Sequence, residues 1–300
     1  MAIFKKIKLI LKNTLITIIA IVFIFPLIAT VADSFMSIDE VNNDYRLVLN
    51  KTDDIGNSLF QSDSGSNKEE RVSIQIIPDK ISIEQYYQTL IENFDYIKMF
   101  WNSVKISVLI SLLTFIIAFP QSYVFAKVKF KGSSLVFFIY IIVMMMPFQV
   151  TLLPNYLLLR FMNLLNTHSA LILPAAFSPF GVFLLTQFMR YVPNETIESF
   201  KLESNSLFRL FSHIIIPAVK PGIIALFVLV FAESWNMVEQ PLIFLTDEFL
   251  YPLSLALNGT RLSNSLGAPF AGAVLYVIPI ITLYFYFEEE IIAGFSNWKF

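Results

Sequence analysis

Long apolar segments alternate with polar ones along most of this chain. A helix needs ~20 mostly apolar residues to cross a bilayer, and six segments come close to or exceed that length: 13–35, 102–126, 133–158, 167–190, 220–245 and 269–293. The longest polar interruptions fall at 36–101 and 191–219. The pattern predicts an all-α, polytopic membrane protein with six transmembrane helices.

Composition and charge support this interpretation and orient the chain. Apolar residues make up 56% of the sequence and charged residues 15%, which is typical of a membrane protein. Cytoplasmic loops carry an excess of basic residues. The basic residues that would lie inside are Lys5, Lys6, Lys8, Lys12, Lys127, Lys129, Lys131, Arg190, Lys201, Arg209, Lys220 and Lys299. We therefore expect both termini in the cytoplasm.

The first apolar segment has two interpretations. A basic start, an apolar run and Thr30-Val31-Ala32 are typical of a cleavable signal peptide. The run is long for a signal peptide and contains Pro26, which favours a retained helix. The expected organisation is a cytoplasmic tail at 1–12, a first transmembrane helix at 13–35, an extracytoplasmic loop at 36–101 and a helical core at 102–300 that includes the 191–219 loop.

The sequence lacks the residues that several kinds of chemistry require. There is no cysteine, and the two histidines, His168 and His213, are far apart. Gly267 and Gly272 have the spacing of a phosphate-binding loop, but Ala273-Val274 stands where Lys and Ser or Thr should be. No basic run indicates nucleic acid, and no cluster of acid, base and nucleophile indicates an enzyme. We expect no catalytic residue, metal or cofactor in this chain.

The 191–219 loop has the pattern of two short amphipathic helices. Asn194 is placed to cap the first helix and Ser206 the second, which Pro217 closes. Glu195 and Glu198 lie in the first turn, where the helix dipole favours acidic side chains. Apolar residues recur at helical spacing, and we expect them to face the membrane domain: Ile197, Phe200, Leu202, Leu207, Leu210 and Phe211.

Polar residues within the apolar segments are candidates for lining a path through the membrane. Glu233, Asn236 and Gln240 are spaced by three and four, so they share one face of a continuous fifth helix. A carboxylate at mid-bilayer costs ~2.5–3.5 kcal/mol on insertion scales, so it is expected to face a cavity or a partner. Gln149 and Asn155 lie in the third segment. Hydrogen bonding between helices is the alternative role.

The 191–219 loop resembles the cytoplasmic EAA loop of ABC importer permeases. Glu198 falls on the motif glutamate and Glu203 on its aspartate, and Ile216-Pro217 followed by Lys220-Pro221 matches the end of the motif. The sequence departs from the motif where Ser199 and Phe200 replace two alanines and Ser204 replaces a glycine.

Other parts of the chain resemble the same family in the same order. The third segment carries Met145-Met146-Pro147-Phe148-Gln149 and then Pro154-Asn155-Tyr156, which is similar to the family's Met-x-Pro-x-Gln and Pro-x-Tyr. Trp235-Asn236 precedes Pro241-Leu242, and Tyr251-Pro252-Leu253 follows. The chain thus resembles the permease subunits of carbohydrate-uptake, maltose-type ABC importers. The 36–77 extension is longer than this family leads us to expect.

The resemblance implies a fold, partners and a mechanism. The fold would be that of a type I ABC importer permease in the bacterial cytoplasmic membrane. A second permease, two ATPase subunits that bind ATP and Mg²⁺, and an extracytoplasmic sugar-binding protein would complete the importer. A sugar, as an oligosaccharide, would cross by alternating access. The ATPase-coupling residues would be Glu195, Glu198, Ser199, Lys201, Glu203, Ser204, Asn205, Phe208 and Arg209.

One different transport mechanism also fits the apolar pattern. Glu233 and Glu239 would lie inside the fifth segment, and intramembrane carboxylates relay protons or ions in secondary transporters. Such a protein would transport alone, driven by an ion gradient.

Overall fold

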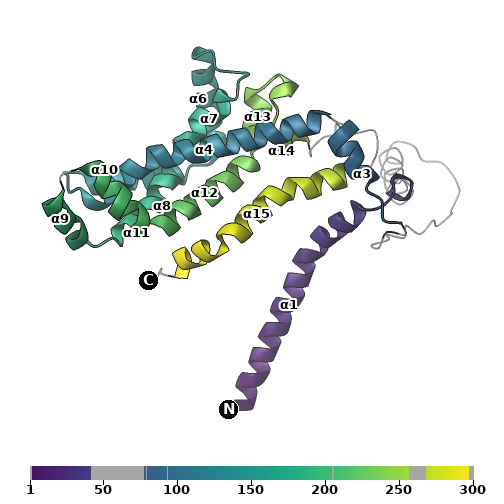
Figure 1. The fold of residues 1–300 in the computed structure, drawn as a ribbon, viewed down its shortest axis with the longest axis horizontal. Helices are drawn as coiled ribbons and strands as arrows, with labels where there is room; N and C mark the ends of the chain where they lie inside the picture. The colour runs from purple at the N-terminus through teal and green to yellow at the C-terminus, as the bar shows by residue number, and fades with distance from the viewer. Residues whose placement is uncertain are drawn as a thin grey trace, which may run out of the picture. The chain divides into compact units, whose positions relative to one another are not determined.

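The computed structural model describes residues 2–41, 78, 80–92, 94–204, 206–256 and 268–296, with side chains described only from residue 10 and up to residue 290. Every regular element in these ranges is a helix (Figure 1). The chain divides into two compact units, residues 1–97 with 259–278 and residues 98–258 with 279–300. Asn205 and most of the 36–77 extension lie outside the described residues.

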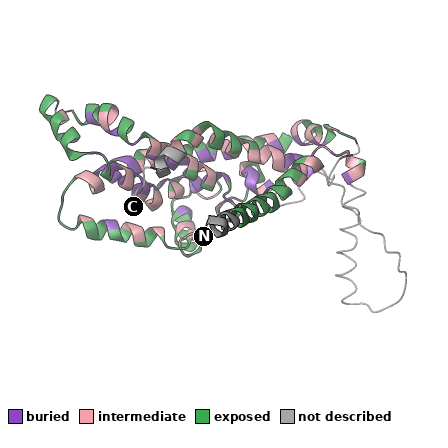
Figure 2. Ribbon diagram, turned by 90° about the horizontal axis from the view of Figure 1, so that it is seen from below, coloured by how far each residue is buried: buried purple, intermediate pink, exposed green. Residues whose placement is uncertain are grey.

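In the first unit, a long apolar helix ends in a turn held by one buried glutamine. The described side chains of α1 (Ala2–Asp33) are mostly exposed (Figure 2). Gln85, in α3 (Glu84–Tyr87), is fully buried, and its Nε2 donates to the carbonyls of Asp33 at 3.0 Å and Met36 at 2.7 Å. A π-helical turn, η1 (Gln88–Glu92), follows. The two bonds therefore join the end of α1 to α3.

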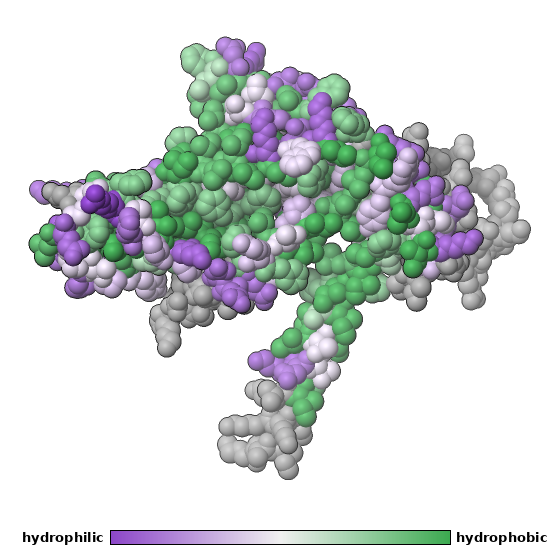
Figure 3. All heavy atoms as spheres, viewed as in Figure 1, coloured by the Kyte–Doolittle hydropathy of each residue, from purple (hydrophilic) through white to green (hydrophobic). Residues whose placement is uncertain are grey.

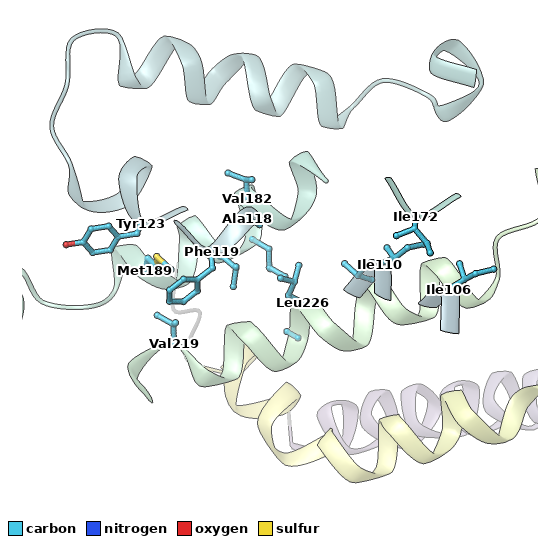
Figure 4. Close-up of a cluster of buried hydrophobic side chains, with 14 of the residues drawn as sticks. Ile106, Ile110, Ala118, Phe119, Tyr123, Ile172, Val182, Met189, Val219 and Leu226 are labelled. Carbon is cyan, nitrogen blue, oxygen red and sulfur yellow. The ribbon is translucent and has the colours of Figure 1, made fainter. Parts of the chain in front are cut away.

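Three helices of the second unit share its main apolar core: α4 (Phe94–Lys127), α8 (Pro179–Arg190) and α12 (Lys220–Trp235). Figure 4 shows its buried side chains, among them Ile110, Phe119, Val182, Met189 and Leu226. Glycines allow the helices to approach closely. A Cβ atom at Gly181 would lie 3.0 Å from Thr114 Cγ2, and one at Gly222 would lie 2.4 Å from Phe188 Cγ. Membrane helices commonly associate through such small residues.

The third predicted span is broken rather than continuous. α5 (Ser133–Met144) and α6 (Phe148–Phe161) meet at 96°. Pro147 stands just before α6 with φ −58° and ψ 136°. Proline cannot donate a helical hydrogen bond and disfavours the helical conformation in the residue before it, which accounts for a break at this point.

The fifth predicted span also differs from the structure. α12 ends at Trp235 instead of continuing to residue 245, and a short helix, α13 (Glu239–Phe244), follows. The side chain of Asn236 donates to the carbonyl of Ala232 at 2.8 Å, so it satisfies one of the helix's terminal carbonyls. The chain continues through η3 (Glu248–Leu250) and α14 (Leu253–Ala256).

Four segments of the described residues are long and apolar enough to cross a membrane: Ile10–Asp33, Phe94–Lys127, Ser169–Arg190 and Ala268–Glu290. The third of these combines α7 (Ser169–Ala176) with α8, and the fourth lies in α15 (Ala268–Ser296). Two bent pairs raise the number to six if each is one span. They are α5 with α6, and residues 207–218 with α12, which meet at 77°.

Several short helices form the polar loop of residues 191–219, named here the α9–α11 loop: α9 (Asn194–Glu203), α10 (Leu207–Leu210), η2 (Phe211–Ile215) and α11 (Ile216–Ala218). Ser206 caps α10 as predicted, because its Oγ accepts from the backbone N–H of Arg209 at 3.4 Å. The predicted cap of α9 is wrong: Pro193 occupies that position and Asn194 is already helical. The helical segment ends just past Pro217, at Ala218.

Candidate functional site

The α9–α11 loop is attached to the core of the second unit through a few apolar side chains. Ile197, Leu210 and Ile215 are buried in the core cluster, and Phe200 packs against it. The ring of Phe211 also packs there, as described below. The prediction that the apolar face of the loop points to the membrane domain is confirmed for Ile197, Phe200, Leu210 and Phe211.

Other apolar side chains of the same loop point outward. Leu202 is 91% exposed and Leu207 61%, against the prediction, and Phe208, which was predicted as a coupling residue, is 81% exposed. In Figure 3, polar and apolar atoms are intermixed over the end of the second unit that carries α9 and α10. Large apolar side chains gathered on a polar surface indicate a protein-binding site. Their exposure follows from the short helices, which have room for one buried face only.

The charged side chains predicted for coupling lie on the same short helices. Glu195, Glu198, Lys201, Glu203 and Arg209 are exposed. Ser199 is exposed and donates to the carbonyl of Thr196 at 3.1 Å, while Ser204 is half-buried. The loop therefore exposes large apolar and charged side chains together, and protein interfaces contain both kinds.

One lysine joins α4 to the start of the α9–α11 loop. Lys127 Nζ donates to the carbonyl of Val192, to Asn194 Oδ1 at 3.1 Å and to the carbonyl of Arg190 at 3.5 Å. The guanidinium of Arg190 lies over the ring of Phe137 in α5, 4.9 Å from its centroid. The turn between α8 and α9 is thus held by side chains from two other helices.

The predicted path residues do not share one helical face. Glu233 lies on the last turn of α12, Asn236 just after it and Gln240 in α13, so the break at residues 236–238 separates them. The continuous helix on which that prediction depended is wrong. Glu233 is exposed and Gln240 half-buried, and Asn155 is half-buried in α6.

The structure instead pairs Gln149 with Glu239. Gln149 Nε2 lies 3.2 Å from both carboxylate oxygens of Glu239, which joins the first turn of α6 to the first turn of α13. Both residues lie near the bends in their segments. Whether Gln149, Asn155, Glu233, Asn236 and Gln240 line a substrate path stays a prediction.

The segment of residues 245–254, named here the α13–α14 segment, is held by side chains from α4 and from the turn between α6 and α7. Asn166, at φ 59°, accepts through Oδ1 from the N–H groups of Thr246 at 3.0 Å and Asp247 at 2.8 Å. From α4, Asn102 Nδ2 donates to the carbonyls of Phe249 at 2.9 Å and Tyr251 at 3.1 Å. These bonds fix the backbone of a loop that has little regular structure of its own.

Sequence reasoning missed Lys127, Asn102 and Asn166 as structural contacts. A lysine at the end of an apolar helix is an ordinary interface residue, and asparagine near a helix end is common. Their partners lie 63 to 149 positions away in the chain, from Arg190 for Lys127 to Tyr251 for Asn102. Asn166 left a weak signal, because asparagine tolerates the left-handed conformation better than most residues do.

The arrangement of the helices is that of a known class of membrane protein. The structure matches a chain of a bacterial ABC transporter involved in the import of the acidic polysaccharide alginate, with a TM-score of 0.74 and 18% sequence identity, over 95% of this chain and 97% of that one. This likeness defines the fold as that of an ABC importer permease. The predicted fold class is confirmed.

Residues 110–289 match the family described as the binding-protein-dependent transport system inner membrane component, and the chain belongs to that family. The match covers the α9–α11 loop together with the second half of α4 and most of α15. The resemblance drawn from the sequence is therefore confirmed at the level of the family, and the chain is an inner-membrane component of a transport system.

Named relatives are permease proteins of several transport systems. The arabinooligosaccharides transport system permease protein AraQ of Halalkalibacterium halodurans is 30% identical over 73% of this chain and 79% of its own length. The lactose transport system permease protein LacG of Rhizobium radiobacter is 28% identical, over 65% and 72%. The sn-glycerol-3-phosphate transport system permease protein UgpE of Brucella abortus is 24% identical, over 75% and 83%.

Proposed function

We propose that this chain is a permease subunit of an importer for an oligosaccharide, driven through its α9–α11 loop by a separate ATPase. The observation that carries the proposal is that Leu202, Phe208 and Glu198 are all exposed on one polar loop of a membrane protein. The names of the arabinooligosaccharide and lactose relatives support a saccharide as the substrate.

The proposed mechanism is mechanical. Hydrolysis of ATP, bound with Mg²⁺ by two ATPase subunits, would supply the free energy. Movement of the α9–α11 loop with those subunits would turn the membrane helices of this chain and of a homologous second permease, so that a cavity opens alternately to the two sides. This chain would contribute no covalent step and would bind no nucleotide itself.

The proposal also assigns sides of the membrane. The α9–α11 loop and both termini would be cytoplasmic, and residues 36–101 would face the sugar-binding protein outside. The 36–77 extension would be an additional docking surface for that protein. Deletion of 36–77 without any loss of uptake would exclude this role.

Purification of the assembled complex from membranes tests the proposal directly. We expect a second permease and an ATPase to co-purify with this chain, and uptake by the reconstituted complex to require ATP, the binding protein and an oligosaccharide. Uptake by the isolated chain, driven by an ion gradient without an ATPase, would contradict the proposal and establish secondary transport.

Replacement of Glu198 by alanine is expected to lower uptake and binding-protein-stimulated hydrolysis together. Its exposed carboxylate would pair with a basic residue of the ATPase, and a charge-assisted contact is worth about 1.5–3 kcal/mol, or roughly 10- to 150-fold in affinity. Uptake and binding-protein-stimulated hydrolysis should fall by a comparable factor while the chain still inserts. Glu92→Ala, at an exposed carboxylate outside the loop, is the control. Wild-type transport by Glu198→Ala would exclude the assigned role.

The change Glu239→Gln separates the two transport mechanisms. The glutamine can still accept a hydrogen bond from Gln149 through its carbonyl oxygen, so uptake by an ATP-driven importer should stay within about twofold of wild type. A carrier that relays protons through Glu239 would lose uptake altogether. The measurement is initial-rate uptake with and without an uncoupler, with Glu233→Gln as the matched variant. Loss of uptake in either variant would favour ion coupling.

A further inference from the structure

Both ends of the α9–α11 loop are attached to the last turns of one helix, α4. At the start of the loop, Lys127 donates to the carbonyl of Val192 and to Asn194 Oδ1. Toward its end, the ring of Phe211 packs edge-on against Tyr123, at 5.0 Å between centroids, and against Phe119 at 5.6 Å. The loop is therefore joined to α4 by side chains, in addition to its covalent links with α8 and α12.

The chemistry of Lys127 suits this position. The last carbonyls of a helix have no partner within the helix and carry partial negative charge, and a lysine ammonium has three N–H donors. Lys127 directs them at the carbonyl of Arg190, the last residue of α8, at the carbonyl of Val192 just beyond it, and at the side chain of Asn194. Because Lys127 is the last residue of α4, this contact ties the position of the turn to that helix.

The other end of α4 is attached to a different loop. Asn102 donates to the carbonyls of Phe249 and Tyr251, and Ser103 Oγ accepts from the N–H of Leu253 at 2.7 Å. Lys98 Nζ lies 3.8 Å from the centroid of the Phe249 ring. These residues hold the α13–α14 segment, which follows α12 and α13 in the chain, whereas the α9–α11 loop precedes α12.

A helix of this length bridges the two loops in one piece. From Ser103 to Lys127, at ~1.5 Å per residue, α4 extends roughly 36 Å, about the thickness of a bilayer. Its buried side chains, including Ile106, Ile110 and Ala118, pack along the core, so the helix can move only with its neighbours.

We propose that α4 transmits movement between the α9–α11 loop and the α13–α14 segment, with Lys127 and Asn102 as the positioning residues at its two ends. This inference rests on the proposed function. In the proposed importer, the binding protein acts on one side of the membrane and the ATPase on the other. Movement therefore has to be transmitted across the membrane. Neither residue touches substrate or nucleotide; each acts by holding a loop to the helix.

The test uses the complete importer in lipid nanodiscs, with its ATPase, second permease and loaded binding protein. The measured quantity is the ratio of ATP hydrolysis with the binding protein to hydrolysis without it. Lys127→Met should keep the ATPase bound and basal hydrolysis unchanged, while the ratio falls at least about fivefold. Lys127→Arg should recover most of the ratio, because guanidinium can donate to the same carbonyls. Lys129→Met, at an exposed lysine two residues further on, is the matched control.

The opposite end of α4 provides an independent variant. Asn102→Leu should also lower the ratio, and the double variant should lose no more than the stronger single one, because both changes interrupt the same connection. Wild-type stimulation in Lys127→Met, loss of the ATPase from that variant, or multiplying losses in the double variant would each overturn the role of α4. Absence of any ATPase from the wild-type complex would instead overturn the proposed function.

Discussion

Replacement of Leu202 and Phe208 by serine should release the ATPase from the purified complex and lower uptake at least about tenfold. The two side chains are 91% and 81% exposed, so they contribute little to the fold of the chain itself. A buried anchor at an interface typically contributes 2 kcal/mol or more, which corresponds to roughly 30-fold in affinity for each residue. This is the largest effect on assembly that we expect from the loop.

The measurement is the amount of ATPase that co-purifies with the variant, together with uptake in vesicles. Phe161→Ser is the matched control, because Phe161 is 85% exposed and ends α6, away from the α9–α11 loop in the sequence. The Phe161→Ser variant should co-purify with an unchanged amount of ATPase. Full recovery of the ATPase with the double serine variant would mean that the exposed apolar pair is not an interface.

Gly222→Ala is expected to destabilise the second unit by about 1–3 kcal/mol, the usual cost of overpacking a tight core. The added Cβ would lie 2.4 Å from Cγ of Phe188 and 2.9 Å from its Cβ. These atoms are close to the backbone of α8, so the ring cannot move aside without shifting the helix. Separation of α8 and α12 should also move the α9–α11 loop, which connects them.

Thermal unfolding in detergent, followed for the purified complex, measures this effect. Gly222→Ala should lower the midpoint, and Phe188→Ala added to it should restore part of the loss, because the ring that causes the clash is gone. Gly132→Ala is the control for loss of a glycine without a clash, because a Cβ atom at Gly132 would meet nothing within 4 Å. The φ of +87° at Gly132 adds some backbone strain to this variant. A midpoint for Gly222→Ala equal to that of wild type would contradict the proposed close contact.

The sequence predicted where the membrane helices are but not where two of them break. Proline alone does not locate a break, because Pro26, Pro120 and Pro279 lie inside long helices while Pro147 stands at a bend of 96°. At Asn236 the fifth span breaks without a proline beside it. In each case neighbouring helices decide whether a local preference ends a helix, and a linear pattern does not contain that information.

For the candidate site, the sequence located the loop and the cap at Ser206, because both depend on residues close together in the chain. It placed Leu202 and Leu207 on the wrong side. Helical spacing marks all apolar residues of an amphipathic helix alike, but a short helix at the edge of a domain can bury only some of them. The choice between them depends on the surface onto which the loop packs.

The sequence by itself determined that this chain lies in a membrane and belongs to a family of transporter components, because span length, apolar content and ordered motifs are local properties. Only the tertiary structure decided which polar groups meet. Lys127 reaches Val192, 65 positions away, and Gln149 reaches Glu239, 90 positions away. Such pairs depend on how helices cross, and the crossing is set by the packing of glycines such as Gly222 against the neighbouring helix.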